Sequence, residues 1–201
     1  MMVSSLVLAS GSSARRALLE ASGVPHHCHP VALDEEKIRL ACQERGESLH
    51  DTALALAEAK ARLACQQVPA GSWVIGADQI LDLNGEAFAK PLDLEQAKAQ
   101  LRRLRGKAHV LQTAVVLMRD GASMWHEVAA PCLTMRHFSD AFLEMYLAQE
   151  GEALLSCVGA YRLEGLGIQL FASLDGAHDA VLGLPRLGLM EALRRAGVLP
   201  Q

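Results

Sequence analysis

The chain has 201 residues, of which 51% are hydrophobic, and it carries a formal net charge of −4. This length and apolar content suit one sizeable α/β domain or two closely packed lobes, and they exclude a largely disordered chain. The acidic balance and the small aromatic set (two Trp, two Tyr and four Phe) disfavour a nucleic-acid-binding protein. No apolar run approaches the length of a membrane span, so we expect no membrane association.

The five cysteines lie far apart in the sequence and form no C-x-x-C pair. Such a scattered, odd-numbered set is typical of reduced thiols. Residues 1–9 lack the basic segment and the long apolar run of a secretion signal. Together these features predict a cytoplasmic protein without disulfide bonds.

Residues 6–20 pass from a short apolar run through small residues into a helical pattern that carries Arg15 and Arg16. We expect a buried strand, a loop rich in free backbone N–H groups, and a helix with Ser13 as its N-cap. A helix N-terminus with cations beside it suits an anion such as a phosphate group. An ordinary capped helix with two solvated arginines is the alternative that this stretch leaves open.

An acidic loop at residues 33–36 and a long helix at residues 52–67, with Asp51 as its N-cap, are expected next. Carboxylates such as that of Glu35 are usually solvated, but they also supply the hard oxygen ligands that Mg²⁺ and Mn²⁺ prefer. Lys60 lies beside the apolar stripe of the expected helix, and a lone helical lysine is most often solvated.

The strand expected at residues 73–83 is almost continuously apolar but contains the sequence GADQ at residues 76–79. A carboxylate in such a setting is costly unless it is paired, bound to a metal or facing a cleft. The small residues before Asp78 would let a ligand approach the backbone closely. We therefore interpret Asp78 as a functional residue.

The second half of the sequence predicts a helix over residues 93–105, strands at residues 109–118 and 123–136, and a helix that begins at Ser139. Residues 156–169 then contain three glycines and a single carboxylate, Glu164. This composition predicts a flexible, close-packed loop before a strand at residues 168–173. It is not a dinucleotide-binding fingerprint, because the third glycine is missing and the strand follows the glycines.

Taken in order, these segments resemble the Maf (septum-formation) family of nucleoside triphosphate pyrophosphatases. The resemblance covers nearly the whole chain, and six or more weak motifs in sequence make it specific. The motifs are LASGS at residues 8–12 with Arg15, DE at 34–35, AKA at 59–61, GADQ at 76–79, KP at 90–91, His109 with Thr113, the glycine-rich residues 159–167, and GLP at 183–185.

The resemblance implies an α/β fold in which a long, twisted mixed sheet is flanked by helices and two lobes enclose a central cleft. Residues 1–201 are then expected to form a single Maf-like domain. Members of the family are hydrolases that cleave the α–β phosphoanhydride bond of nucleoside triphosphates, with a divalent cation such as Mg²⁺, Mn²⁺ or Co²⁺ as cofactor. Many of them are dimers, so a homodimer is one assembly that the resemblance implies.

The resemblance also implies the roles of individual residues. The residue types suit attack of water on the α-phosphorus, which needs positioned groups and neutralisation of the triphosphate charge and no covalent nucleophile. Carried over by position, the catalytic proton acceptor is Asp78, the triphosphate-binding residues are Ser12, Arg15, Lys60 and Lys90, and the metal ligands are Glu35 and Asp78.

Three positions bear on the base of the nucleotide. Gln79 and Glu164 resemble the branch of the family that acts on 7-methyl-GTP, whereas the pyrimidine branch has threonine and glutamine at these positions. A carboxylate at Glu164 can accept hydrogen bonds from guanine N1–H and the exocyclic amine, and it favours a positively charged base. Ala14 departs from both branches, which have tryptophan or arginine there.

We therefore expect a preference for 7-methyl-GTP that is weaker than in members keeping the tryptophan. Two alternatives stay open at this stage. One is a pyrophosphatase for dTTP and UTP, and the other is a nucleotide-binding regulator of septation without catalysis. Asp78, Lys60 and Lys90 favour an enzyme, because a binding module has no need of a carboxylate beside the scissile phosphate.

Overall fold

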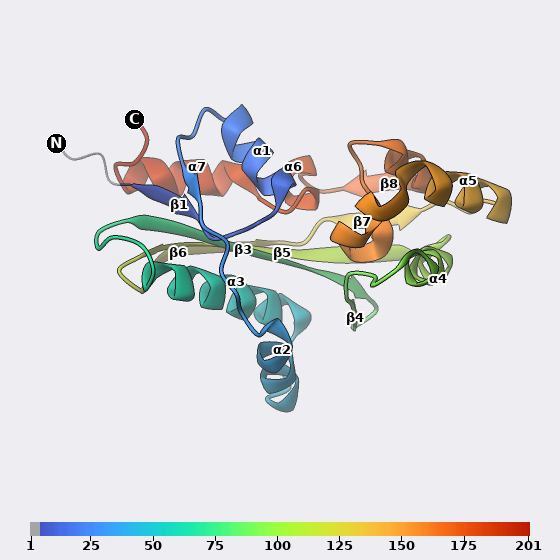
Figure 1. The fold of residues 1–201 in the computed structure, drawn as a ribbon, viewed down its shortest axis with the longest axis horizontal. Helices are drawn as coiled ribbons and strands as arrows, with labels where there is room; N and C mark the ends of the chain where they lie inside the picture. The colour runs from blue at the N-terminus through green and yellow to red at the C-terminus, as the bar shows by residue number, and fades with distance from the viewer. Residues whose placement is uncertain (1–4) are drawn as a thin grey trace. The chain divides into compact units, whose positions relative to one another are not determined.

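A mixed β-sheet with helices on both faces organises the chain in the computed structural model, which describes residues 5–201 (Figure 1). The expected α/β class, with a mixed sheet flanked by helices, is confirmed. The first four residues of the stretch interpreted above as lacking a secretion signal lie outside the described residues. Over the described part of the chain, no helix has the length and apolar character needed to cross a membrane.

The sheet formed by the described residues has eight strands. Their order is β2-β1-β3-β5-β7-β8, with β4 paired to β3 and β6 paired to β5. Strand β1 runs parallel to β2 and β3, whereas the β3–β4, β5–β6, β5–β7 and β7–β8 pairs are antiparallel. The strands are β1 Leu6–Leu8, β2 His27–Cys28, β3 Trp73–Leu83, β4 Glu86–Phe88, β5 Ala108–Arg119, β6 Ala122–Ala129, β7 Cys132–Met135 and β8 Phe171–Asp175.

Seven α-helices and three 3-10 helices complete the part of the chain from residue 5 onward. The α-helices are α1 Ser13–Ala21, α2 Glu35–Glu44, α3 Leu49–Cys65, α4 Leu94–Leu104, α5 Asp140–Glu150, α6 His178–Val181 and α7 Arg186–Arg195. The 3-10 helices are η1 Gly151–Ser156, η2 Val158–Ala160 and η3 Leu166–Leu170.

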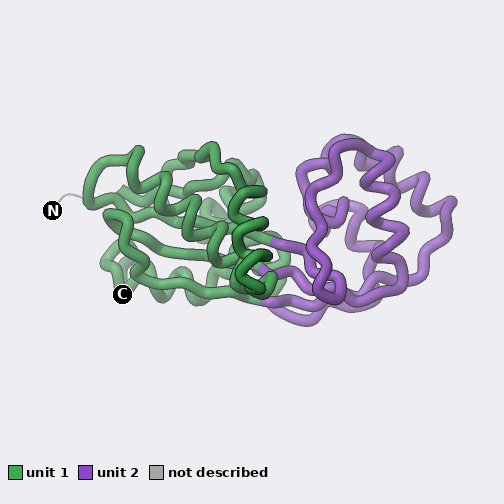
Figure 2. The backbone as a smooth tube through the Cα atoms, turned by 90° about the horizontal axis from the view of Figure 1, so that it is seen from below, with its two compact units in different colours: residues 1–79, 113–129, 177–201 green, residues 80–112, 130–176 purple. Residues whose placement is uncertain are grey.

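The chain divides into two compact units (Figure 2). The first unit comprises Met1–Gln79, Thr113–Ala129 and Ala177–Gln201, and the second comprises Ile80–Gln112 and Ala130–Gly176. Strands β3 and β5 each contribute residues to both units. The cleft expected between two lobes, and the organisation of residues 1–201 as a single domain, stay predictions.

The first unit is built around the alternating faces of β3. Trp73, Ile75 and Ala77 are buried in one cluster with apolar side chains of α1 and α7. Because successive side chains of a strand point to opposite faces, Gly76 and Asp78 lie on the other face, which α3 covers (Figure 1). The buried residues of α3 are Thr52, Ala53, Leu56, Ala57, Ala61 and Ala64, mostly small side chains that let the helix approach the sheet closely.

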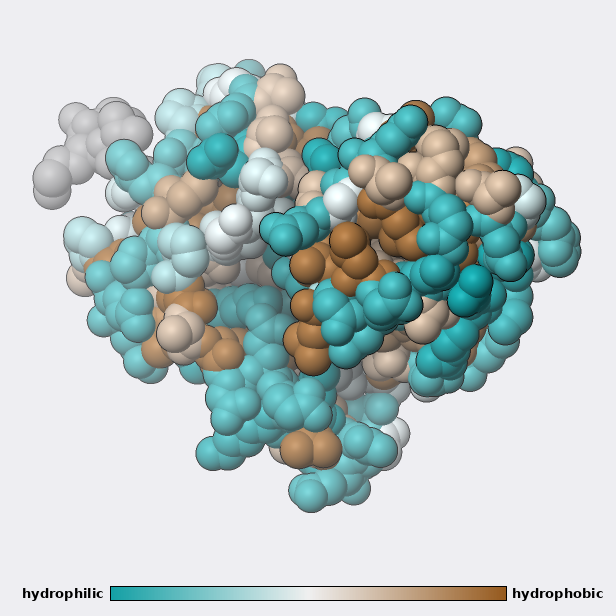
Figure 3. All heavy atoms as spheres, turned by 45° about the vertical axis from the view of Figure 1, so that its right-hand side comes forward, coloured by the Kyte–Doolittle hydropathy of each residue, from teal (hydrophilic) through white to brown (hydrophobic). Residues whose placement is uncertain are grey.

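The second unit packs α4 and α5 with the 3-10 helices. Leu101 and Leu104 of α4 and Leu143 and Tyr146 of α5 are fully buried. His109 is also buried in this unit, where its Nε2 lies 2.9 Å from the hydroxyl oxygen of Tyr161. Hydrophilic side chains predominate on the face shown in Figure 3, with hydrophobic ones interspersed.

Four local predictions were wrong. The single strand expected at residues 123–136 is two strands, β6 and β7, because Pro131 between them has no N–H to donate to a ladder. Ser48, not Asp51, is the N-cap of α3, and its hydroxyl accepts the Asp51 N–H at 3.1 Å. Residues 33–36 are not an acidic loop, since Asp34 caps α2 and accepts the Lys37 N–H at 3.1 Å.

The fourth correction concerns α1. Its N-cap is Ser12 and not Ser13, which is the first residue of the helix. Ser12 has extended backbone angles (φ −70°, ψ 119°), and its hydroxyl accepts the backbone N–H of Arg15 at 3.4 Å.

Candidate active site

The loop between β1 and α1 is tied together by serine hydroxyls. Ser10 Oγ accepts the backbone N–H of Ser12 at 3.2 Å and an N–H from Nη1 of Arg15, also at 3.2 Å. The Ser12 hydroxyl caps the helix that follows. The loop is therefore held in a fixed conformation at the N-terminus of α1, where unpaired amides and the helix dipole favour an anion.

Arg15 extends from α1 to two backbone segments of the first unit. Its Nε donates to the carbonyl of Gly183 at 2.8 Å, and its Nη1 donates to the carbonyl of Ala77 at 3.0 Å. Burial lowers the pKa of Arg15, and the nearby carboxylates of Asp78 and Glu35 act in the opposite direction. A guanidinium stays protonated under any of these influences, so Arg15 is a fixed positive charge beside the residue that precedes Asp78.

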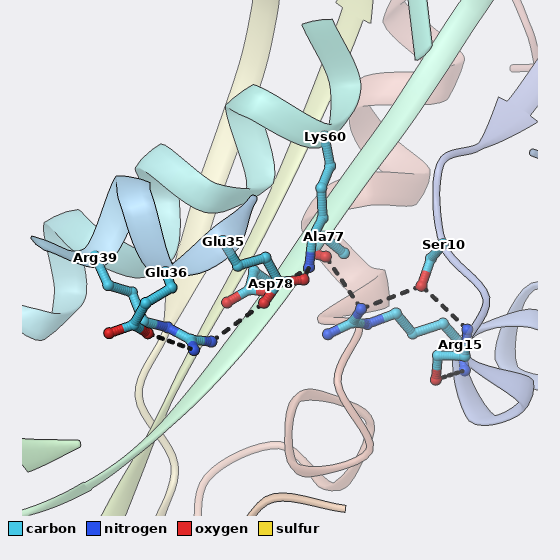
Figure 4. A network of polar contacts seen from close by, with 9 residues as sticks. Ser10, Arg15, Glu35, Glu36, Arg39, Lys60, Ala77 and Asp78 are labelled. Atoms are coloured by element: carbon cyan, nitrogen blue, oxygen red, sulfur yellow. Dashed lines mark hydrogen bonds and ion pairs between the residues drawn. The ribbon is translucent and has the colours of Figure 1, made fainter. Parts of the chain in front are cut away.

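Three side chains meet beside Ala77 (Figure 4). The ammonium of Lys60, from α3, lies 2.6 Å from Oδ1 of Asp78, from β3. The same ammonium lies 2.8 Å from Oε1 of Glu35, at the start of α2. One cation thus joins two carboxylates from different elements, and the sequence predictions for Asp78, Lys60 and Glu35 fall on residues in direct contact.

The site is more buried on the sheet than on α2. The side chains of Asp78 and Lys60 are 7% and 14% exposed, whereas that of Glu35 is 37% exposed. Charges that are buried to this degree need partners, because their desolvation costs several kcal/mol each. The functional interpretation of Asp78 rested on this cost, and the structure supplies Lys60 as its partner.

Gly76 explains how Lys60 reaches the strand. A Cβ atom at this position would lie 2.2 Å from the carbonyl oxygen of Ala57 and 2.7 Å from the Cβ of Ala61. The backbone of α3 therefore packs directly on the backbone of β3 at this point, which no larger residue allows. Lys60 and Asp78 flank this close contact, so the glycine sets the distance between the two charges.

Arg39 is a member of the site that sequence reasoning missed. Its Nη2 donates to Oε2 of Glu35 at 3.2 Å, and its Nη1 lies 4.0 Å from Oε2 of Glu36 (Figure 4). Glu35 and Arg39 are separated by four residues on α2, a spacing at which helical side chains meet. This spacing was a signal in the sequence that would have found Arg39 once α2 was known to be a helix.

The carboxylates suit a divalent cation. Oδ2 of Asp78 is buried and has no hydrogen-bond partner among the described residues, which is unusual for a carboxylate oxygen. No group of three or more His, Cys, Asp or Glu side chains in residues 5–201 is arranged to hold a metal ion. One or two carboxylates together with substrate phosphates are nevertheless the usual Mg²⁺ ligands, so the residues present fit such an ion.

Gln79 has a structural task that the sequence did not reveal. Its Nε2 lies 2.8 Å from Oγ1 of Thr113 and 3.1 Å from each of the carbonyl oxygens of Ala180 and Val181. Thr113 is fully buried and itself donates to the Ala180 carbonyl at 3.0 Å. The amide of Gln79 therefore joins β3 to β5 and α6, and the orientation of its side chain is fixed by these contacts.

The remaining predicted site residues lie elsewhere. Ala14 is half-buried in α1, within the first unit. Lys90, after β4, and Glu164, in the segment before η3, are exposed residues of the second unit. The structure thus brings Glu35, Lys60 and Asp78 into contact and places Arg15 near them, while the roles of Lys90 and Glu164 stay predictions.

Comparison with known proteins gives consistent matches over almost the whole chain. A family model described as "Maf-like protein" matches residues 5–196. A protein of Gluconobacter oxydans named nucleoside triphosphate pyrophosphatase is 58% identical over 97% of this chain and 96% of its own length. A protein of the same name from Granulibacter bethesdensis is 49% identical over 94% of this chain and 96% of its own length.

Some relatives carry a more specific name. A Brucella abortus protein named 7-methyl-GTP pyrophosphatase is 43% identical over 94% of this chain and 95% of its own length. The proteins with the general name thus include more similar sequences than this one, so the names favour the reaction more strongly than they favour one base.

Proposed function

Because this chain belongs to the Maf family, we propose that it hydrolyses nucleoside triphosphates to the monophosphate and pyrophosphate. It is a nucleoside triphosphate pyrophosphatase, a hydrolase of the α–β phosphoanhydride bond. The observation that carries this conclusion is the contact of Lys60 with both Asp78 and Glu35, at 2.6 and 2.8 Å, inside a largely buried site. Positioned charges of both signs are what phosphoryl chemistry requires.

Asp78 acts as the proton acceptor. In the reaction, one water attacks the α-phosphorus, the bond to the bridging oxygen breaks, and pyrophosphate leaves with the bond electrons. Oδ2 of Asp78 has no partner among the described residues, so it can orient the attacking water and take its proton. Oδ1 stays bound to Lys60, which keeps the carboxylate in one orientation.

Lys60 and Arg15 neutralise negative charge on the phosphates. The ammonium of Lys60 offers three N–H donors, and Arg15 adds a fixed charge on the other side of Ala77. The N-terminus of α1, capped by Ser12, supplies oriented backbone amides for a phosphate oxygen. Lys90 is proposed for the same task on its position in the family motif alone.

Glu35 and Asp78 would hold a divalent cation such as Mg²⁺, Mn²⁺ or Co²⁺. Such an ion would lower the pKa of a coordinated water and would offset charge on the phosphoryl oxygens. Arg39 donates to Oε2 of Glu35, whereas Lys60 contacts Oε1, so the orientation of this carboxylate is fixed without a metal ion. This arrangement resembles the second shell that orients metal ligands in other sites.

We propose that the enzyme prefers 7-methyl-GTP to dTTP and UTP as substrate. The support is Glu164, whose carboxylate complements both the donor edge of guanine and the positive charge of an N7-methylated base. Relatives named 7-methyl-GTP pyrophosphatase at 43–44% identity support the same leaning. Ala14 lacks the aromatic ring that would stack on a cationic base, so the preference is expected to be modest.

We propose that the enzyme is cytoplasmic. All five cysteines are free thiols in the structure, which fits a reducing compartment such as the cytoplasm. We also propose that the protein forms a homodimer, because many members of the family are dimers. Size-exclusion chromatography with light scattering would give the mass of the assembly directly.

The proposed activity is tested by pyrophosphate release from nucleoside triphosphates. Asp78→Asn keeps size and polarity but removes the charge, so turnover should fall by a factor of about 10²–10⁴, the usual contribution of a positioned base. Asp82→Asn on the same strand is the control and should stay near the wild-type rate. A chelator should abolish turnover, and Mg²⁺, Mn²⁺ or Co²⁺ should restore it.

Two results would contradict the proposal. Near wild-type turnover by Asp78→Asn would exclude this residue as the base. Absence of pyrophosphate release from every nucleotide, with tight nucleotide binding retained, would instead support a regulator that binds without catalysis.

A further inference from the structure

Glu150 lies at a position in α5 that is unfavourable for a negatively charged side chain. It is the last residue of α5, where the negative end of the helix dipole opposes a carboxylate. Its side chain is only 8% exposed, so solvent relieves little of this cost. A charge in such a place persists when specific hydrogen bonds compensate it, and the partners of Glu150 therefore indicate its task.

Both oxygens of the carboxylate bind one short segment, residues 162–167. Oε1 accepts the backbone N–H of Leu166 at 2.9 Å, and Oε2 accepts an N–H from Nη1 of Arg162 at 3.3 Å. The two contacts lie on either side of Glu164 in the sequence. One side chain on α5 thus holds the segment at two points.

Two glycines fit the segment closely around this carboxylate. A Cβ atom at Gly165 would lie 2.6 Å from Oε1 of Glu150, and one at Gly167 would lie 2.3 Å from the carbonyl oxygen of Arg162. The glycine-rich composition is therefore required by space, because side chains at these positions would expel the carboxylate or open the segment. The close packing predicted for this loop is confirmed, and the segment is a turn held by Glu150 at two points.

Glu164 lies at the exposed side of this turn. Within the described residues its carboxylate has no hydrogen bond or ion pair of its own. Nothing but the backbone of the segment fixes where this side chain is presented. The backbone is in turn held by Glu150 through Leu166 and Arg162.

We propose that Glu150 is a positioning residue for base selection, because it fixes the turn that presents Glu164. The inference rests on the proposed role of Glu164 toward the base. It adds a determinant of specificity that does not itself touch the nucleotide. A purely structural role for Glu150 would change the stability of the second unit without changing which base is preferred.

The test compares kcat/KM for 7-methyl-GTP and UTP and follows the ratio of the two. Glu164→Gln should change this ratio, and Glu150→Gln should change it in the same direction by up to about tenfold, since a charge-assisted hydrogen bond is lost. Glu144→Gln is the matched control. It removes a carboxylate from the same helix, where Glu144 pairs with Lys98 at 2.6 Å, and should leave the ratio unchanged.

A double variant separates action through Glu164 from other effects. In the Glu164→Gln background, Glu150→Gln should shift the ratio no further. Hydrogen exchange at the Leu166 amide should be faster in Glu150→Gln than in the wild type. If Glu150→Gln does not fold, Arg162→Met removes one of the two anchors and should shift the ratio in the same direction by a smaller factor.

Each outcome decides between the two claims. If Glu164→Gln shifts the ratio but Glu150→Gln does not, the positioning role is wrong while the proposed base contact stands. If the two shifts add in the double variant, Glu150 acts by another route and the inference is wrong. If Glu164→Gln leaves the ratio unchanged, the base contact itself fails and the inference falls with it.

Discussion

Replacement of Lys60 by methionine is the sharpest test of the charge arrangement in the site. Met keeps the length of the side chain and removes its charge, so Asp78 and Glu35 lose the ammonium that joins them. The carboxylate of Asp78, with 7% of its side chain exposed, would be left buried without a cationic partner at hydrogen-bond distance. We expect a large loss of stability together with loss of turnover.

The magnitude follows from the geometry. At the 2.6 Å between Lys60 Nζ and Asp78 Oδ1, the attraction is about 6 kcal/mol for an effective dielectric constant of about 20. Desolvation of two buried ions offsets most of this, but removal of one ion leaves the penalty of the other uncompensated, typically about 3–5 kcal/mol. Glu35 is 37% exposed and is partly relieved by water, so we expect about 3 kcal/mol in total.

Urea unfolding followed by tryptophan fluorescence measures this loss. Both tryptophans, Trp73 and Trp125, belong to the first unit, so the signal reports on the unit that contains Lys60 and Asp78. Arg195→Met is the control, because Arg195 and its partner Glu191 belong to the same unit and are 76% and 53% exposed, and such surface pairs contribute less than about 1 kcal/mol.

A second variant tests the cause of the loss. Lys60→Met combined with Asp78→Asn removes both charges, and it should recover most of the stability that Lys60→Met loses. If Lys60→Met costs no more than Arg195→Met, or if the double variant recovers nothing, the carboxylate does not depend on the lysine and the reasoning is refuted.

Two further predictions concern the scaffold. Burial lowers the pKa of His109 to about 4, below its value of about 6.5 in the unfolded chain. The folded state therefore binds fewer protons than the unfolded state between these two pH values. The free energy of unfolding should be full above pH 6.5 and should fall by about 3 kcal/mol at most as the pH falls toward 4. Urea unfolding at pH 7 and pH 5 checks this. The loss should shrink in His109→Gln and persist in a variant of the exposed His126, and an equal loss in all three proteins would exclude His109. Gly76→Ala places a Cβ atom 2.2 Å from the Ala57 carbonyl oxygen, so α3 must shift; we expect about 1–3 kcal/mol of destabilisation and a fall in turnover. Unchanged turnover with normal stability would show that the glycine does not set the position of Lys60.

Much of the fold could be predicted from the sequence because its signals are local. Asp93 caps α4 as expected, accepting the Gln96 N–H at 2.7 Å, since capping depends on residues three apart. A wrong prediction arose where two neighbouring residues were equally suitable for one position and the sequence could not decide between them. Ser12 and Ser13 are both acceptable caps for α1, and only the backbone angles of the folded chain select the first.

The sequence predicted which residues belong to the candidate site better than it predicted which of them contact one another. Asp78 stood out because a carboxylate in an apolar strand is costly, and the structure pairs it with Lys60. That Lys60 is the partner could not be derived, because the two residues lie on different elements and meet only where α3 crosses Gly76. Arg39 was missed for a simpler reason: residues 33–36 were predicted as an acidic loop and no helix was predicted between this loop and residue 52, so Glu35 and Arg39 were not placed one helical turn apart.

Gln79 shows why residue type alone is a weak guide to specificity. The family motif associates this position with the base, but its Nε2 contacts Thr113 and the carbonyls of Ala180 and Val181. A threonine at position 79 would be too short to span these three acceptors, so the change would loosen α6 before it altered any contact with a nucleotide. The residue at this position therefore has a structural task, while its role toward the base stays a prediction. An exchange of Gln79 for threonine should be judged by stability and by base preference together, since only the second reports on recognition.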